Sequence, residues 1–220
     1  MRITALQPQV NNPDRVNVAV DGQFLLGVHA LLVYQMGLKV DQELTPEQLA
    51  QLREGEAQQQ AVERALGFLA LRPRSREEIR RYLRRKDTPS ELIDAVLERL
   101  EQLELVNDRD FTTFWVESRD RFSPRGARAL KSELRMKGVK REVVDELVSS
   151  EQDEERVEEA ARKKAQMLAR QPGMDYTTFA RRLGSFLQRR GFNYDITTRT
   201  VRALWKELRE ETPGEDDVPE

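Results

Sequence analysis

A repeat of about 50 residues constrains the fold of this chain more than any other feature. Matching leucines stand at Leu83, Leu134 and Leu187, so the spacings are 51 and 53 residues. Each leucine is followed by a short turn that begins with a basic residue, at Lys86-Asp87, Lys137-Gly138 and Arg190-Gly191. A fixed period with room for three helices is typical of tandem helical repeats. The chain is therefore predicted to be mainly α-helical, with three tandem three-helix, helix-turn-helix-like repeats in an elongated curved array.

Residues 65–86, in the first repeat, show the pattern most clearly. Ser75 and Glu78 have the S-x-x-E spacing of a capping box, which starts a helix by satisfying its first amide groups. At 100° per residue, the apolar residues of this helix gather on one side: Ile79, Tyr82 and Leu83. The arginines gather on the opposite side: Arg76, Arg80, Arg81, Arg84 and Arg85. Residues 72–86 hold eight basic and two acidic residues, so this helix presents a single sign of charge.

Further capping residues mark other helix starts. Thr88-Pro89-Ser90-Glu91 has the spacing of a second capping box, Asp108 is expected to cap the first helix of the second repeat, and Asn193 to open the last helix. Four aromatic residues at helical spacing are interpreted as core rather than as base-stacking platforms: Phe111, Phe114, Trp115 and Trp205. Tyr82 lies on a helix flank, and its role stays open.

Residues 1–28 follow the period of β-strands instead. Val16, Val18 and Val20 alternate with polar residues, a turn is expected at residues 11–14, and Asp21-Gly22 favours a tight hairpin. About three strands are expected, followed by a short apolar helix that Gly37 stops. Thr45-Pro46 then starts a helix that runs past Leu52, and residues 54–60 are either a linker or the start of the next helix.

These patterns predict five segments. They are a small β-rich N-terminal module at 1–55, three-helix repeats at 56–107, 108–150 and 151–211, and an acidic disordered tail at 212–220. The chain is 35% charged and 38% hydrophobic, which suits slender helical modules. The net charge of −2 hides separated opposites, because residues 119–141 hold nine basic and two acidic residues while residues 210–220 hold six acidic and no basic ones. The tail is expected to aid solubility, or else to fold back and compete for the arginines.

Composition argues against an enzyme. The chain has no cysteine, so disulfides, thiolate nucleophiles and zinc–cysteine sites are excluded. His29 is the only histidine and is expected to be structural, and no phosphate-binding G-x-x-x-x-G-K-[ST] loop occurs. The carboxylates of residues 151–159 are interpreted as a solvated acidic run. We expect no catalytic residue, metal or cofactor, and a soluble, cytoplasmic monomer, because the sequence has no signal peptide and no apolar run long enough to span a membrane.

Three pieces of this sequence resemble the RecX family. They are the Arg-Pro-Arg-Ser break at 72–75, the cap at Asn107-Asp108, and the segment from Glu133-Leu134 to the turn at Lys137-Gly138. The resemblance covers roughly residues 58–210 and is weaker in the third repeat, where GFNYDIT at 191–197 fits the closing helix. The N-terminal module at 1–55 is expected to lie outside the core that the family shares.

The resemblance implies a function. RecX proteins are negative regulators of the RecA recombinase in homologous recombination, DNA repair and the SOS response. They bind in the groove of the RecA filament on single-stranded DNA and inhibit ATP hydrolysis and strand exchange. The expected partners are therefore the RecA filament and single-stranded DNA, with duplex DNA as a further candidate.

Basic residues near the second helix of each repeat are the candidate contacts with RecA or DNA. Arginine forks bind phosphates or protein carboxylates in a bidentate manner, and three matched basic faces would form one strip if the repeats stack with a constant rotation. The candidates are Arg72, Arg74, Arg76, Arg80, Arg81, Arg84, Arg85, Lys86, Arg125, Arg128, Lys131, Arg135, Lys137, Arg181, Arg182 and Arg189.

Three other interpretations stay open at this point. The basic faces could be solvated surfaces without a partner, or the chain could be a nucleic-acid-binding repeat protein that acts on DNA or RNA independently of RecA. An adaptor that binds a strand along the N-terminal sheet is a third. A helix-turn-helix reader of duplex sequence is disfavoured, because the helix starts lack a consistent set of base-edge donors.

Overall fold

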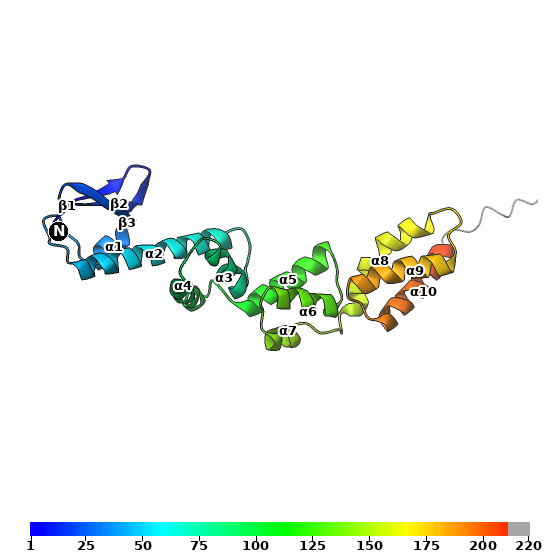
Figure 1. The fold of residues 1–220 in the computed structure, drawn as a ribbon. Helices are drawn as coiled ribbons and strands as arrows, with labels where there is room; N and C mark the ends of the chain where they lie inside the picture. Colours follow the sequence, from blue (N-terminus) through cyan, green and yellow to red (C-terminus); the bar gives the residue numbers. More distant parts are fainter. Residues whose placement is uncertain (211–220) are drawn as a thin grey trace, which may run out of the picture. The chain divides into compact units, whose positions relative to one another are not determined.

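The computed structural model describes residues 1–210, which divide into two compact units. One unit consists of Met1–Arg72 and Ile79–Leu105, and the other of Pro73–Glu78 and the residues from Val106 onward. The predicted class is confirmed: the chain is mainly helical and begins with a three-stranded sheet (Figure 1). The tail predicted for residues 212–220 lies outside the described residues.

The N-terminal sheet is antiparallel, with strands β1 (Ile3–Gln9), β2 (Asn12–Val20) and β3 (Gln23–His29) in the order β1-β2-β3. The predicted hairpin is confirmed, because Asp21 and Gly22 have φ angles of 52° and 83° between β2 and β3. The first turn lies at residues 10–11, earlier than expected, because Asn12 already pairs with Gln9. Apolar side chains of the sheet form a core with the short helix α1 (Ala30–Gln35) and the start of α2 (Pro46–Leu69).

Helix α2 (Pro46–Leu69) begins with the predicted threonine cap. Thr45 Oγ1 accepts a hydrogen bond from the Gln48 amide, and Gln48 Oε1 accepts one from the Thr45 amide. The helix continues without a break for 24 residues, so residues 54–60 do not form a linker. The boundary expected near residue 55 therefore falls inside one helix, whose two ends belong to the same compact unit.

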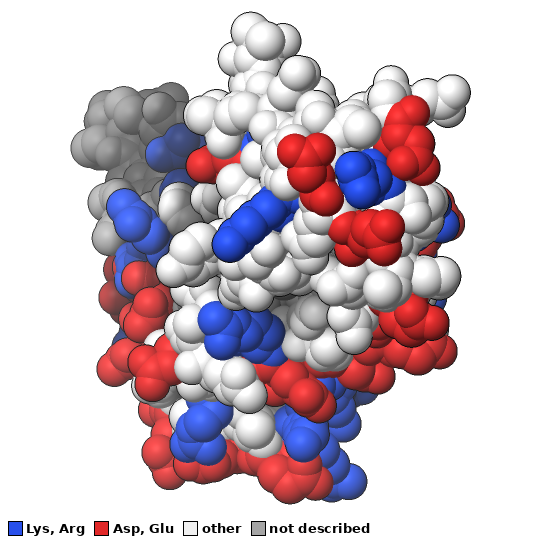
Figure 2. All heavy atoms as spheres, turned by 90° about the vertical axis from the view of Figure 1, so that its left-hand side faces the viewer, with Lys and Arg blue, Asp and Glu red and all other residues white. Residues whose placement is uncertain are grey.

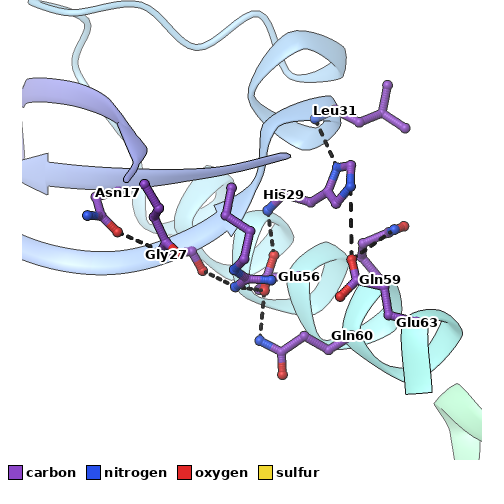
Figure 3. Close-up of polar contacts among 10 residues, drawn as sticks. Asn17, Gly27, His29, Leu31, Glu56, Gln59, Gln60 and Glu63 are labelled. Carbon is purple, nitrogen blue, oxygen red and sulfur yellow. Dashed lines mark hydrogen bonds and ion pairs between the residues drawn. The ribbon is translucent and has the colours of Figure 1, made fainter. Parts of the chain in front are cut away.

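A buried glutamate on α2 explains why this polar stretch stays helical. Glu56 is 5% exposed, and its carboxylate accepts hydrogen bonds from the His29 amide at 2.8 Å and the Gln60 amide group at 2.7 Å. Arg15 of β2 forms an ion pair with the same carboxylate. The contacts converge on Glu56 between the sheet and the helix (Figure 3). A buried charge is stable only when it is paired and hydrogen-bonded, so this cluster fixes the sheet on α2.

The three predicted repeats each contain three helices. Repeat 1 consists of the second half of α2 with α3 (Arg76–Arg84) and α4 (Ser90–Gln102). Repeat 2 consists of α5 (Asp108–Phe122), α6 (Ala127–Met136) and α7 (Arg141–Leu147). Repeat 3 consists of α8 (Asp153–Ala169), α9 (Tyr176–Arg189) and α10 (Tyr194–Glu210). The leucines that defined the repeat, Leu83, Leu134 and Leu187, are fully buried, which explains why the period was visible.

The capping predictions had mixed outcomes. The Ser75–Glu78 box is confirmed, with Ser75 Oγ accepting from the Glu78 amide at 3.1 Å, and Asn193 Oδ1 accepts from the Ile196 amide at 2.8 Å. The box predicted from Thr88 is wrong, because α4 begins after Pro89 without a side-chain cap and Thr88 Oγ1 is buried without a hydrogen-bond partner among the described residues.

Three of the four aromatic residues that were predicted to be core pack as expected: Phe111, Trp115 and Trp205. Phe111 is 1% exposed, and Trp115 and Trp205 pack against the cores of repeats 2 and 3. Tyr82, whose role was open, stacks on Phe68 of α2 with ring centroids 4.2 Å apart. Its ring is therefore engaged within repeat 1.

Candidate nucleic-acid and protein interface

The charges of the N-terminal module do not gather by sign. On the face of the molecule that this module presents, Lys and Arg are interspersed with Asp and Glu among neutral side chains (Figure 2). His29 is structural, because its Nδ1 accepts a hydrogen bond from the Leu31 amide and its Nε2 lies 3.9 Å from Glu63 (Figure 3). The basic residues that are candidates for an interface lie in the repeats instead.

The predicted cations of repeat 1 differ in how far their side chains are exposed. Four are exposed at the end of α3 and in the turn that follows: Arg81, Arg84, Arg85 and Lys86. Arg80 instead forms an ion pair with Asp94 of α4 at 2.6 Å, with its side chain only 26% exposed. Three more are half-buried around the start of α3: Arg72, Arg74 and Arg76.

In repeat 2 one cation of the predicted basic face, Lys131, is neutralised by the repeat itself. Lys131 Nζ lies 2.8 Å from the Asp145 carboxylate of α7, and Arg141 contacts the same carboxylate at 3.2 Å. Hydrogen bonds from both cations lower the pKa of Asp145 below its usual value, and the bond from Lys131 has the larger effect. Arg135 Nε donates to the backbone oxygen of Lys131. Arg128 is exposed, and no ion pair to it occurs among the described residues.

Arg125, which was predicted to contact RecA or DNA, forms an ion pair with Glu133 of its own repeat. The Glu133 carboxylate accepts hydrogen bonds from Trp115 Nε1 and Arg119 Nε, both at 2.8 Å, and lies 3.0 Å from Arg125 Nε. The Glu133 side chain is 13% exposed, so two guanidinium groups compensate one largely buried carboxylate. Arg125 therefore has a structural role in repeat 2.

Lys137, another predicted contact, is also held internally. Its Nζ lies 2.8 Å from Glu78 and 4.0 Å from the centre of the Trp115 ring. The backbone oxygen of Lys137 accepts a hydrogen bond from Ser75 Oγ at 2.6 Å. These contacts lie within the second compact unit, to which residues 73–78 belong.

Repeat 3 keeps its cations together and accessible. Arg181, Arg182 and Arg189 are exposed on α9, and they line a concave surface of about 510 Å³ with Lys164 of α8. Arg182 is oriented by a hydrogen bond of 2.7 Å to Gln171 Oε1, which is a neutral partner. The sequence reasoning missed Lys164. Its signal was the Lys163-Lys164 pair, which follows the acidic start of α8.

A recurring contact at the helix starts was also missed. Asp108 Oδ1 accepts a hydrogen bond from the Arg76 amide at 2.9 Å, and Asp153 Oδ1 accepts one from the Ala127 amide at 2.9 Å. In both cases the first residue of one repeat's first helix caps the second helix of the repeat before it. The prediction that Asp108 caps its own helix is therefore wrong, since Asn107 Oδ1 fills that role with the Arg109 amide. We name this contact the joint.

Two glycines allow the joint to close. A Cβ at Gly138 would lie 2.3 Å from the Cβ of Glu77, and one at Gly191 would lie 2.4 Å from the Cβ of Ala129. Both glycines follow the second helix of their repeat and have positive φ, at 82° and 89°. Asp87 has the corresponding position in repeat 1, with a φ of 56° and an exposed side chain. Glycine is thus required where this turn packs against the second helix of the preceding repeat, as it does in repeats 2 and 3.

Asp153 is part of a buried charge cluster and is the exception in the predicted solvated acidic run at 151–159, whose glutamates are exposed as expected. Asp153 is 2% exposed, and Arg156, 5% exposed, lies 3.7 Å from it. Arg156 also donates to both carboxylate oxygens of Asp120, at 2.8 and 3.1 Å. Burial raises the pKa of the Asp153 carboxyl above its usual value, an effect that the Ala127 hydrogen bond and Arg156 oppose. The cluster joins α5 of repeat 2 to α8 of repeat 3.

Residues 1–210 contain no group of three or more His, Cys, Asp or Glu side chains that could hold a metal ion. Within the same range, every helix is too short or too polar to cross a membrane.

Comparison with protein families gives a consistent result over much of the chain. Residues 1–45 match the family model "Regulatory protein RecX N-terminal domain", residues 61–100 the RecX first three-helix domain, and residues 107–147 the second. The N-terminal match corrects the expectation that the module at 1–55 lies outside the shared core.

Similar proteins cover nearly the whole chain. Proteins described as "Regulatory protein RecX" from Bacillus pumilus and Bacillus subtilis are 26% and 28% identical over 97% of this chain and 81% of theirs. One from Clostridium beijerinckii is 28% identical over 92% of this chain and 95% of its own. A crystal structure of regulatory protein RecX matches the fold with a TM-score of 0.71 at 23% identity, covering 90% of this chain and 98% of that one. A RecX structure from Lactobacillus salivarius matches 70% of this chain and 97% of its own with a TM-score of 0.58.

Proposed function

Because the chain belongs to the RecX family of regulatory proteins, we propose that it is a negative regulator of the RecA recombinase. It binds in the groove of the RecA filament on single-stranded DNA and inhibits ATP hydrolysis and strand exchange. The proposal makes the protein a binding module rather than an enzyme. It acts by bridging neighbouring RecA protomers, which restrains the rearrangement that accompanies ATP turnover.

Exposed cations on the second helix of each of the three repeats are the observation that carries this proposal. The second helices α3, α6 and α9 each begin a segment with accessible arginines, such as Arg84, Arg128 and Arg181. Arginine suits this task, since its planar fork pairs with phosphate oxygens and with protein carboxylates. The three faces are proposed to act together along the filament groove. Arg125 contributes by holding repeat 2 together through Glu133, and Lys137 by joining repeat 2 to the start of α3 through Glu78.

One comparison separates this function from nucleic-acid binding without RecA. The ATPase rate of RecA on single-stranded DNA is measured with increasing amounts of the protein, and its affinity for the same DNA is measured alone at matched salt. A RecA regulator lowers the ATPase rate at concentrations where little of the DNA is coated by the protein itself. Inhibition that appears only once free DNA is saturated would instead indicate competition for DNA.

A charge reversal on repeat 1 tests the contact surface. The variant Arg81→Glu/Arg84→Glu/Arg85→Glu changes exposed side chains, so the fold is expected to persist and inhibition to weaken. Lys39→Glu/Arg53→Glu is the matched control, because both cations are exposed and lie outside the basic faces. Full inhibition by the α3 variant would remove repeat 1 from the proposed interface.

A further inference from the structure

Helices α8 and α9 lie side by side in repeat 3 (Figure 1). Two adjoining hollows lie on their surface. The first is the basic hollow described above, whose charged lining side chains are all cations: Lys164, Arg181, Arg182 and Arg189. The second is larger, about 1150 Å³, and is also lined by Lys164. The shared lysine makes the two hollows neighbours on one surface.

Aromatic rings line the second hollow. Phe122, the last residue of α5, is 76% exposed, and Phe186 of α9 faces the same space. Each ring has a guanidinium nearby: Arg121 lies 5.3 Å from the centre of the Phe122 ring, and Arg190 lies 4.6 Å from that of Phe186. An exposed aromatic ring beside cations is the arrangement on which unpaired bases stack, because every base has a π-face.

The acidic side chains of the second hollow restrict where a phosphate can bind. Glu155, Glu158 and Glu159 line it from the start of α8, whereas Lys163 and Lys164 lie one to two turns further along the same helix. Carboxylates repel a phosphate but tolerate a neutral base. A strand would therefore place its phosphates on the basic hollow and a base toward the Phe122 ring.

We propose that repeat 3 binds single-stranded DNA by stacking an unpaired base on Phe122 while Lys164, Arg181, Arg182 and Arg189 hold the adjoining phosphates. This inference rests on the proposed function, which supplies single-stranded DNA as the ligand. It adds a site that recognises an unpaired base. Charge favours nucleic acid over a protein partner, since the basic hollow has no carboxylate in its lining to contribute to a mixed protein interface. In a duplex the paired bases are stacked on each other, so this pocket selects single strands.

The test uses the full-length protein and two oligonucleotides of equal length, oligo-dT and the same strand with abasic sites. Both carry the same phosphates, and only the first has bases. Phe122→Ala is expected to lower the affinity for oligo-dT about tenfold, in the range of one stacked base, and to leave the affinity for the abasic strand unchanged. Phe24→Ala is the matched control, because Phe24 is 66% exposed in the N-terminal sheet, and it is expected to change neither affinity.

A second variant addresses the phosphates separately. Lys164→Glu is expected to weaken binding to both strands by the same factor and to reduce the salt dependence of each. Equal losses on both strands for Phe122→Ala, or no loss on either, would overturn the stacking site. A Phe122→Ala variant that loses RecA inhibition while keeping oligo-dT affinity would also overturn it, because the pocket would then receive protein. If wild type binds oligo-dT through Phe122 but does not inhibit RecA, the proposed function fails and this inference stands.

Discussion

Helices α6 and α9 hold corresponding positions in repeats 2 and 3 but treat their cations differently. In repeat 2, Lys131 is paired with Asp145 of the neighbouring helix. In repeat 3, Arg182 has a neutral glutamine as partner, and Arg181 and Arg189 are exposed beside Lys164. Two segments that look equally basic in sequence therefore differ in the charge they offer a partner. The availability of a cation is decided by the carboxylates that the fold brings to it.

The same helices differ in how their first turns are capped. Helix α6 has no side-chain cap of its own and depends on Asp153 of the next repeat. Helix α9 begins with its own cap, because Asp175 accepts from the Thr178 amide at 2.8 Å. The second helix of repeat 3 thus starts independently of any neighbouring repeat, whereas that of repeat 2 does not.

The largest expected effect comes from removing the accessible cations of repeat 3. Arg181→Glu/Arg182→Glu/Arg189→Glu is expected to lower the affinity for single-stranded DNA on the order of 100-fold at low salt and to reduce the salt slope by about 2. The matched variant Arg128→Glu/Lys131→Glu/Arg135→Glu is expected to reduce the slope less, by about 1.4, because Lys131 is already paired and two cations remain available. Affinity titrations across salt concentrations measure both. Equal slopes would erase the distinction between the two repeats.

The next largest expected effect is a loss of stability when an aspartate of the joint is replaced. Asp153→Ala leaves the first turn of α6 without a side-chain acceptor and removes one carboxylate from the buried Arg156, so it is expected to cost about 1–3 kcal/mol in the free energy of unfolding. Asp108→Ala is expected to cost less, about 0.5–1 kcal/mol, since Ser75 still caps α3. Urea denaturation of both variants provides the comparison. A larger loss for Asp108→Ala than for Asp153→Ala would contradict this order.

The two caps are expected to titrate in opposite directions. Burial raises the pKa of Asp153 above the usual 3.8, so the stability it contributes is full below that value and is lost as the pH rises through the folded pKa. Hydrogen bonds from the Thr178 amide and hydroxyl lower the pKa of Asp175, so its contribution is present above 3.8 and is lost as the pH falls through the folded pKa. Unfolding of Asp153→Asn and Asp175→Asn between about pH 3 and pH 7 checks this. Differences from wild type that change with pH in the same sense would contradict it.

The smallest expected effect is an increase, rather than a decrease, in the affinity for single-stranded DNA. Asp145→Asn removes the carboxylate that Lys131 and Arg141 share, and both cations become available on repeat 2. We expect the affinity for single-stranded DNA to rise about twofold to fivefold at low salt. Asp94→Asn, which removes the carboxylate that Arg80 pairs with on α4, is a parallel case in repeat 1. A decrease in either variant would mean that the pairing itself positions a contact.

The features that local sequence specifies were predictable. The buried leucines set the repeat, the Ser75–Glu78 spacing set a cap, and alternating valines set the sheet. Contacts between segments distant in sequence were not. The partners of Arg125 and Lys131 come from tertiary packing, and the polar stretch around Glu56 is helical because Arg15 and His29 meet it. Thr88 and Asp108 show the same limit, since a capping pattern does not reveal which helix start a side chain reaches.

Inhibition of RecA ATPase on single-stranded DNA by three proteins tests the central claim most directly. The α6 triple variant is expected to inhibit somewhat less than wild type, and the α9 triple variant to inhibit weakly or not at all. Full inhibition by the α9 variant, or none by wild type, would contradict the account.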